Sequence, residues 1–422
     1  MTTSPLMTER RVSLIGALLV AIGPVSMALY TPAMTELVRA FGSTEAVIKL
    51  TLTLYFGGFA CAQLIAGPLS DALGRRPVTM AFLGLYCAAS VVAMLAPTVE
   101  VLIVARFMQG VGASVGVAIS RALVRDMFTD EQSSRIMNLI GIILALGPAL
   151  APTLGGLMLL FFGWRSLFVL MTLIGFASIA VIYFCLKETV ERDLSRLNLG
   201  ELGRSYRMLL SNRQFLTAAS VIGGALGTIY AQATFLPFIL IDTVGLSPQQ
   251  FGVAMLAQSG SFFAASLLVR SLMSRVRAAR LVPVGLVFIA IGSVGTSTLL
   301  IWPPSFLHVM IPVAIYAFGI AFVMPAMSTA ALAPFKREAG AAAAMLGFIQ
   351  MGSGLLVGTG GALLGDAVLA MGLLIPMMGA ASCIAYLLYQ RTNIVMPPPT
   401  VQKGAGGVPL APPTSPVTGP EK

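Results

Sequence analysis

Two long apolar runs are joined by the stretch Gly67-Pro68-Leu69-Ser70-Asp71-Ala72-Leu73-Gly74-Arg75-Arg76-Pro77. Its three charges fall within six positions, between glycines and prolines that favour tight turns. Only 10% of the 422 residues are charged, so a cluster of this kind must lie where water reaches it. The stretch therefore predicts a short cytoplasmic loop between two membrane helices.

The composition extends this interpretation to the whole chain. Apolar residues make up 57% of the sequence and the mean hydropathy is +0.91. A soluble domain carries roughly 25% charged residues, so a chain with 10% cannot cover a surface that faces water. About twelve apolar runs reach the length of ~20 residues that crosses the hydrocarbon, and backbone groups in lipid must bond within their own segment, as they do in a helix. The runs lie at residues 12–34, 46–69, 78–96, 99–123, 136–162, 166–186, 215–241, 249–273, 281–302, 306–333, 339–364 and 367–389.

The cations predict the orientation of these helices. All 26 Lys and Arg residues except Arg39, Lys49, Arg106 and Arg165 lie at the two ends of the chain or in alternate loops. Cytoplasmic loops are enriched in Lys and Arg, so both termini are predicted to be cytoplasmic. The net charge of +10 follows from this topology. Because the cations are spread over every inner loop, we expect no nucleic-acid partner.

One long loop divides the chain into two sets of six runs. It spans residues 187–214 and holds six cations and four acids. Two bundles around a central cavity, joined by such a linker, are typical of secondary transporters. We predict a cytoplasmic N-terminus (1–11), a first six-helix bundle (12–186), the linker (187–214) and a second six-helix bundle (215–390). Residues 391–422 are rich in Pro and Gly, which predicts a disordered cytoplasmic tail.

Several classes of chemistry are excluded by what the sequence lacks. It holds one histidine and four cysteines without CxxC spacing, so we predict no metal site and no His-based catalytic set. There is no P-loop through which a domain of this chain would use ATP. We therefore expect no enzyme and no cofactor. The first run is too long for a signal-peptide core, so we expect a retained membrane anchor.

A buried charge is predicted in the fourth run, which contains Arg106-Phe107-Met108-Gln109-Gly110-Val111-Gly112. Arg106 lies about two turns inside the membrane, where an unpaired charge costs several kcal/mol. A cavity, a partner or water must compensate this charge. Alternatively, the side chain reaches the outer surface, because Glu100 marks the helix start six residues earlier and six residues span only about 9 Å.

The fifth run contains Gly147-Pro148-Ala149-Leu150-Ala151-Pro152-Thr153-Leu154-Gly155-Gly156. Its two prolines free backbone carbonyls and kink a helix, and its glycines allow close packing against a neighbour. The pattern predicts a bend that can pivot. The alternative is the ordinary use of Gly and Pro in membrane helices.

In this order and at these spans, the motifs resemble those of the major facilitator superfamily, specifically its twelve-span drug:proton antiporters of the bicyclomycin-resistance (Bcr/CflA) type. The resemblance runs from about Gly23 to Tyr389. Weaker matches add to it at Leu186-Lys187-Glu188-Thr189, Gly245-Leu246-Ser247-Pro248-Gln249-Gln250-Phe251-Gly252 and Phe322-Val323-Met324-Pro325. It implies a multi-pass protein of the bacterial inner membrane with twelve helices in two bundles around a central cavity.

The resemblance also implies roles for the motif residues. The fourth-run arginine, Arg106, would take part in proton coupling, and the fifth-run motif marks exporters. The first loop would form a charge lock on the cytoplasmic side, in which Asp71 faces the start of the eleventh helix and Arg75 pairs with Asp126. The gating residues are thus Asp71, Gly74, Arg75, Arg76, Asp126, Gly147, Pro148, Pro152, Gly155 and Gly156.

The first run departs from the family pattern at the position that bears on coupling. Family members usually carry an aspartate two residues before the tyrosine of a Tyr-x-Pro segment, and here Ala28 precedes Tyr30. No other acid lies deep in a run. Glu36, Asp71 or a proton of the substrate would have to substitute, or transport would be uncoupled. We take Arg106 and Glu36 as the coupling candidates.

Polar and aromatic groups inside the runs are the candidates for the substrate cavity; for each, the alternative is helix packing. They are Tyr30, Tyr55, Gln109, Tyr230, Gln232, Gln258, Tyr316, Phe322, Phe348 and Gln350. A cavity with few fixed charges, many aromatics and several of the 23 methionines suits varied apolar molecules.

We therefore expect a monomer that exports small, largely apolar drugs or toxic compounds in exchange for protons. The alternative with the same fold is a facilitator or exporter of a small metabolite, such as an amino acid, without proton coupling. A membrane sensor or embedded enzyme would show soluble domains or a catalytic cluster, and a channel would show flux without saturation.

Overall fold

The computed structural model describes residues 7–128, 132, 136, 149–194, 199–335 and 338–395. Within these ranges the regular structure is helical, and eleven helical segments are long and apolar enough to cross a membrane. A shorter apolar helix, Ala149–Phe162, lies in the fifth predicted run, whose preceding residues are outside the described ranges. The prediction of an all-α membrane protein is confirmed.

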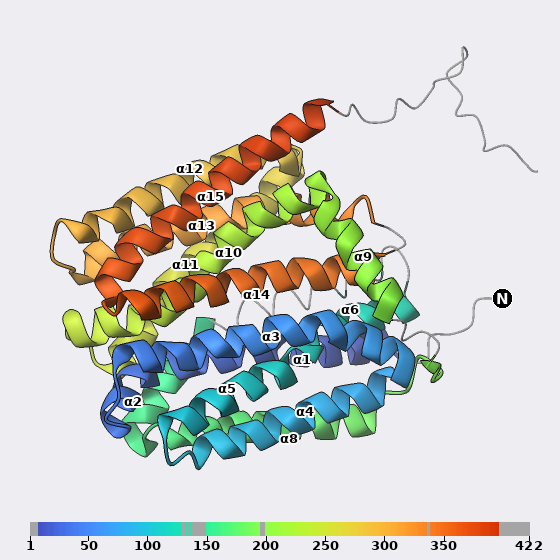
Figure 1. Cartoon of the computed structure of the whole chain (residues 1–422), viewed down its shortest axis with the longest axis horizontal. Helices are drawn as coiled ribbons and strands as arrows, with labels where there is room; N and C mark the ends of the chain where they lie inside the picture. Colours follow the sequence, from blue (N-terminus) through green and yellow to red (C-terminus); the bar gives the residue numbers. More distant parts are fainter. Residues whose placement is uncertain are drawn as a thin grey trace, which may run out of the picture.

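The helices form two groups that follow the order of the chain (Figure 1). The first group contains α1 (Glu9–Tyr30), η1 (Thr31–Ala33), α2 (Met34–Ala40), α3 (Glu45–Leu73), α4 (Arg75–Met94), α5 (Val99–Ala113), α6 (Val115–Met127), the helix Ala149–Phe162 and α8 (Arg165–Cys185). The second contains α10 (Arg213–Pro237), η3 (Phe238–Thr243), α11 (Pro248–Met273), α12 (Ala278–Ser297), η4 (Thr298–Leu300), α13 (Phe306–Leu332), α14 (Ala339–Leu364) and α15 (Ala367–Val395). The two helices α3 and α14 pack against each other at the boundary between the groups.

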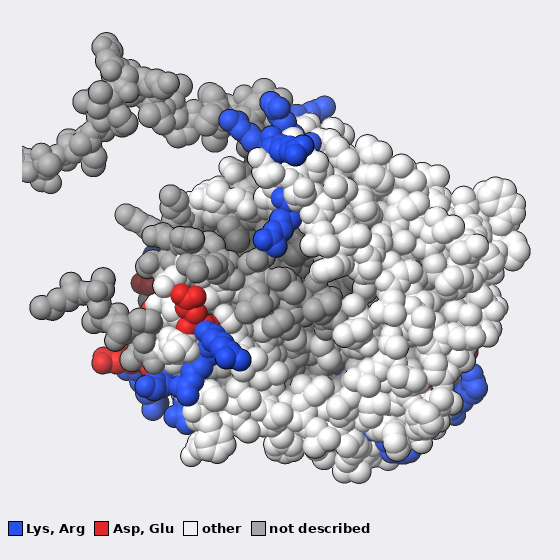
Figure 2. Space-filling model, turned by 180° about the vertical axis from the view of Figure 1, so that it is seen from behind, with Lys and Arg blue, Asp and Glu red and all other residues white. Residues whose placement is uncertain are grey.

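Charge on the surface agrees with the predicted orientation. Figure 2 shows Lys and Arg gathered mainly toward one end of the molecule, and a wide uncharged surface beside them. An uncharged belt of this kind suits contact with lipid tails, which cannot solvate charged groups.

The linker contains a short helix, α9 (Leu199–Ser211), that contacts both halves at the cytoplasmic end. It packs on α10 and α14, while the hydroxyl of Tyr206 donates a hydrogen bond to the carbonyl of Leu64 on α3, at 2.5 Å. Within a regular helix that carbonyl would accept from residue 68, but Pro68 has no N–H. The linker therefore satisfies a carbonyl that Pro68, inside α3, leaves free.

Glycines allow the helices of the first half to approach closely. A Cβ added at Gly110 would lie 2.1 Å from the carbonyl oxygen of Tyr55, and one at Gly58 would lie 2.2 Å from that of Phe107. In lipid, helices associate through such close packing rather than through the hydrophobic effect. These contacts hold α5 directly against α3 and so fix the environment of the adjacent Arg106.

The outer ends of the two halves are tied together by polar contacts. Lys49 of α3 donates to the carbonyl of Gly365 after α14, at 2.8 Å, and the Thr153 hydroxyl donates to the carbonyl of Gly252 on α11, at 2.9 Å. An exposed ion pair joins Arg39 to Asp242 at 3.7 Å. This structure therefore has its two halves held together on the outer side.

Candidate functional site

The first predicted loop is shorter than expected, because α3 continues to Leu73 and α4 begins at Arg75. Ion pairs around a buried arginine hold this junction, which we still call the first loop. The Arg75 side chain is 2% exposed and lies 2.5 Å from Asp71 Oδ1 and 3.2 Å from Asp126 Oδ2. Its Nη1 also donates to the Ser70 hydroxyl at 2.6 Å. The structure thus has the Arg75–Asp126 pair that the resemblance implied, and adds Asp71 to the same arginine.

The contact predicted between Asp71 and the start of α14 is absent from the described contacts. The Asp71 carboxylate is instead directed at Arg75, one helical turn further along the chain. Its closest partner therefore lies in its own half of the molecule. Arg76 likewise bonds within that half, donating to the carbonyl of Tyr183 on α8 at 2.7 Å.

Glu188 completes this loop and was missed by the sequence analysis as a site residue. Its carboxylate accepts from the backbone N–H of Arg75 at 2.8 Å and from that of Arg76 at 3.1 Å, at the N-terminus of α4. Gly74 has φ +101° and a Cβ there would lie 2.7 Å from Glu188 Oε2, so only glycine suits the position. The acid in the Leu186–Thr189 match was the available signal.

The glycines of the fifth-run motif lie between helices of both halves. A Cβ at Gly155 would lie 2.4 Å from the carbonyl oxygen of Leu29 on α1, and one at Gly156 would lie 2.4 Å from that of Pro248 on α11. From the other side, Gly252 approaches the carbonyl oxygen of Pro152 in the same way. Gly147 and Pro148 lie outside the described residues.

Arg106 lies in a cage of tyrosines at the centre of the first half. Its guanidinium carbon is 4.3 Å from the ring centroid of Tyr30 and 4.4 Å from that of Tyr55, distances that give favourable cation–π contacts. The residue is fully buried, at 0% exposed. The alternative that this side chain reaches the outer surface is therefore wrong.

Hydrogen bonds fix the members of this tyrosine cage. Arg106 Nη1 donates to Gln109 Oε1, and Gln109 Nε2 donates to the Ser90 hydroxyl at 2.7 Å. The Tyr30 hydroxyl lies 2.6 Å from Thr51 Oγ1, and the Tyr55 hydroxyl donates to the carbonyl of Gly23 at 2.9 Å. Each ring is thus held on its own helix and against a neighbour, which fixes both rings against the guanidinium.

Two donor atoms of Arg106 form no hydrogen bond with the described residues. Arg106 Nε and Nη2 are buried and have no hydrogen-bond partner among the described residues. Nor does any described carboxylate form an ion pair with this guanidinium; the ion pairs of the described part involve Arg39, Lys49 and Arg75. A buried charge without a counter-ion is costly, so this arrangement calls for a functional explanation.

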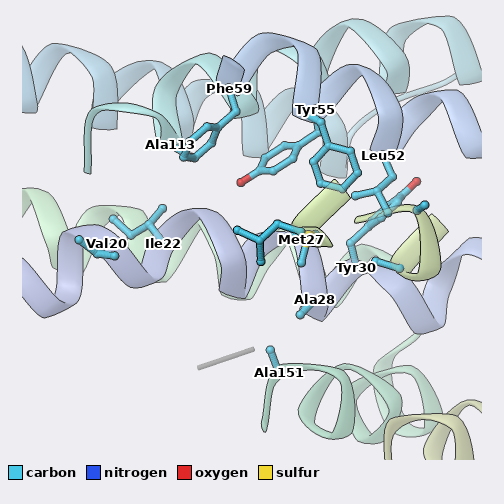
Figure 3. Close-up of a cluster of buried hydrophobic side chains, with 14 of the residues drawn as sticks. Val20, Ile22, Met27, Ala28, Tyr30, Leu52, Tyr55, Phe59, Ala113 and Ala151 are labelled. Atoms are coloured by element: carbon cyan, nitrogen blue, oxygen red, sulfur yellow. The ribbon is translucent and has the colours of Figure 1, made fainter. Parts of the chain in front are cut away.

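The position of the family aspartate faces away from the cage. Figure 3 shows Ala28 on the side of α1 that is directed at Ala151, whereas Tyr30 lies near Tyr55. The other coupling candidate, Glu36, lies in α2, where a Cβ added at Gly163, just before α8, would lie 3.9 Å from its Oε1. Its described contacts are at the outer end of the first half and do not reach Arg106.

The second half holds neutral polar pairs where the first half holds the arginine. Gln258 Nε2 of α11 donates to Gln232 Oε1 of α10 at 2.5 Å, and the Thr228 hydroxyl donates to that of Tyr316 at 2.8 Å. One donor, Gln232 Nε2, is buried without a partner among the described residues.

The remaining cavity candidates are dispersed. Tyr230 contacts Phe56 across the boundary, with ring centroids 5.1 Å apart, and Phe348 and Gln350 are half-buried on α14. Phe322 packs against Phe318 in a separate apolar cluster of α11, α12 and α13. The structure therefore brings Tyr30, Tyr55 and Gln109 together, pairs Gln232 with Gln258, and leaves the others apart.

Comparison with known proteins places these features in one family. The model of the Major Facilitator Superfamily matches residues 16–360. The chain is 29% identical over 344 residues to the uncharacterized MFS-type transporter YdgK of Bacillus subtilis, covering 81% of this chain and 85% of that protein. It is 28% identical over 378 residues to multidrug resistance protein D of Escherichia coli, covering 88% and 93%. The fold matches the crystal structure of a D-xylose-proton symporter with a TM-score of 0.68 at 13% identity, covering 88% of this chain and 97% of that one.

Proposed function

The chain belongs to the major facilitator superfamily and is a multi-pass membrane transporter, and on that premise we propose that it is a drug exporter of the bicyclomycin-resistance type. It acts as a monomer in the bacterial inner membrane. Small, largely apolar compounds enter from the cytoplasm or the inner leaflet and leave outward in exchange for protons. The relatives named for multidrug resistance support this substrate class.

The observation that carries the proposal is the tyrosine cage around Arg106. A fixed buried cation in an otherwise apolar bundle is expensive, so its environment must change with the state of the transporter for the charge to be useful. Because the cage is built from α1, α3 and α5, any rearrangement of these helices changes the contacts of the guanidinium. Proton binding or substrate binding nearby can therefore bias the position of the helices.

Alternating access follows from the way the halves meet. In this structure polar contacts join the outer ends, through Lys49 to Gly365 and Thr153 to Gly252. Breaking these contacts and closing the cytoplasmic side would open the same central region outward. The Arg75 ion pairs lie on the cytoplasmic side, where they hold the first loop in the geometry that closure needs.

A second candidate function is export without proton coupling. It is favoured by the absence of a described carboxylate on Arg106 and by Ala28, which faces Ala151 (Figure 3). A proton-coupled transporter needs a group that titrates in reach of both sides in turn. In this chain the carboxylates with described contacts lie toward the helix ends and loops.

Proton movement in proteoliposomes distinguishes proton-coupled export from export without proton coupling. An interior pH dye records proton flux when chloramphenicol, a neutral hydrophobic antibiotic, is added on the cytoplasmic face. Wild type is compared with Arg106→Ala and with Arg165→Ala, an exposed arginine on the outer side. Antibiotic-triggered proton flux that disappears only in Arg106→Ala supports antiport. Antibiotic export without proton flux supports the uncoupled exporter, and no export of the antibiotic rejects both.

A further inference from the structure

The tyrosine cage has an unused binding edge. Arg106 Nη1 is occupied by Gln109, whereas Nε and Nη2 are buried and unpartnered in the described part of the chain. These two nitrogens form one edge of the planar guanidinium and point their N–H groups in parallel. That edge is the fork that binds a carboxylate through two hydrogen bonds.

We propose that this edge of Arg106 binds the anionic group of the transported molecule, so that the substrates include apolar compounds that carry one carboxylate. The inference rests on the proposed export function and names a substrate class for it. Since the described residues supply no counter-ion at the cage, the substrate supplies it. An unpaired buried cation then becomes a vacant anion site.

The distribution of acids in the chain supports this vacancy. Among the acids of the first half with described contacts, Glu36 lies beside Gly163, before α8, and Asp126 pairs with Arg75. The acids outside the described residues, Asp130, Glu131 and Glu421, belong to segments that the sequence predicts to be an inner loop and the tail. No carboxylate of this chain is therefore expected to occupy the fork.

The surroundings of the fork suit the rest of such a substrate. The Tyr30 and Tyr55 rings cover the guanidinium, and Met171 lies 3.3 Å from Gln109 Nε2 through its sulfur. Aromatic and thioether groups pack well against flat apolar bodies. An aromatic ring that bears a carboxylate thus matches both the charge and the walls.

An anionic substrate would also explain how the second candidate function, export without proton coupling, proceeds without a titrating aspartate. The membrane potential is negative inside, so each negative charge that moves outward moves in the favoured direction. Export of a carboxylate then needs no proton carrier on the protein. The presence of Ala28 in place of the family aspartate therefore does not hinder the export of this class of substrate.

Binding to the purified protein in nanodiscs tests the inference with 2-naphthoate and its neutral amide, 2-naphthamide. We expect wild type to bind naphthoate at least about tenfold more tightly than the amide, because charge-assisted hydrogen bonds are the stronger ones. In Gln109→Glu, a carboxylate of the same shape takes the place of Gln109 on Arg106 Nη1 and supplies a negative charge beside the fork. This variant should lose the preference for naphthoate and melt no lower than wild type.

The controls separate charge at the cage from charge elsewhere. Gln250→Glu makes the same change at the exposed capping box of α11, where glutamate serves as well as glutamine, and should keep the preference. Equal affinity of wild type for the two probes, or a preference that survives in Gln109→Glu, would overturn the inference. If the preference is absent while chloramphenicol is still exported, the inference is wrong and the proposed function stands. If the preference is present while neither chloramphenicol nor naphthoate is exported, the anion site stands and the proposed function is wrong.

Discussion

The interiors of the two halves differ in charge. The first half buries Arg106 among tyrosines with two donors left over, whereas the second half buries neutral pairs such as Gln258 with Gln232. A molecule held between the halves would therefore meet a cation on one side and neutral amides and hydroxyls on the other. If the proposed anion site is right, this difference places the orientation of the substrate, and its response to charge, in the first half.

Removing the positive charge of Arg106 is expected to have the largest effect. Arg106→Gln should lower the transport rate of 2-naphthoate by roughly 100-fold or more, because two charge-assisted hydrogen bonds of about 1.5–3 kcal/mol each are lost. The melting temperature should not fall to match, since the variant also relieves an unpaired buried charge. Efflux from proteoliposomes and thermal melting measure the two quantities. Arg165→Gln is the matched control, and equal loss of transport in both would erase the contrast between the halves.

Separating α5 from α3 should disturb the cage through packing alone. Gly110→Val places a side chain where a Cβ already lies 2.1 Å from the Tyr55 carbonyl oxygen, and overpacking of this kind costs about 1–3 kcal/mol. The melting temperature and transport should fall together. Gly84→Ala on α4 is the control because a Cβ there meets nothing within 4 Å. A Gly110→Val protein that melts like wild type would show that the cage does not depend on this contact.

The first loop and its counterpart in the second half offer a smaller test. Gly74→Ala should destabilise the protein by about 1–3 kcal/mol, because position 74 has φ +101° and its Cβ would contact Glu188. Ser274 follows α11 at the equivalent place with ordinary φ, −68°, so Ser274→Ala should be nearly neutral. Thermal melting of the two variants compares the loops directly. Similar losses of stability in the two variants would show that glycine is not specifically required in the first loop.

The hydrogen bond from the Tyr206 hydroxyl of the linker helix to the Leu64 carbonyl should contribute about 1 kcal/mol to the stability of the protein. Burial raises the pKa of Tyr206 to about 12, above its ordinary value of 10.0, so the neutral donor form is favoured in the folded state. This contribution is complete below pH 10 and is lost as the pH rises through about 12. Tyr206→Phe should show a lower melting temperature at pH 8, and the gap to wild type should narrow above pH 10. A gap that is constant across this range would contradict the assigned hydrogen bond.

The neutral pair of the second half should matter least. Gln258→Leu removes the hydrogen bond to Gln232 Oε1, and Gln232 can then form a different hydrogen bond. We therefore expect a loss of about 1 kcal/mol in stability and a few-fold change in the transport rate. Measuring the transport rates of chloramphenicol and of 2-naphthoate shows whether the change depends on the charge of the substrate. An effect as large as that of Arg106→Gln would place substrate recognition equally in both halves.

Particular residues show how far the sequence could predict the site. The depth of Arg106 in its helix followed from the position of Glu100, and the Arg75–Asp126 pair followed from the resemblance. The role of Glu188 did not, because it caps α4 from more than 100 residues away in the chain. The direction of Ala28, toward Ala151 and away from the cage (Figure 3), likewise depends on how α1 is rotated in the bundle.

The sequence by itself determined that the chain crosses the membrane as helices, predicted which ends face the cytoplasm, and placed Arg106 within the fourth run. These features obey local rules, since lipid requires apolar runs of fixed length with internally bonded backbones. Only the tertiary structure decided that Tyr30 and Tyr55 cover Arg106 and that its Nε and Nη2 edge has no described partner. Helices that are apolar all round carry no stripe that marks the buried face, so their rotation is set by close packing at glycines such as Gly110.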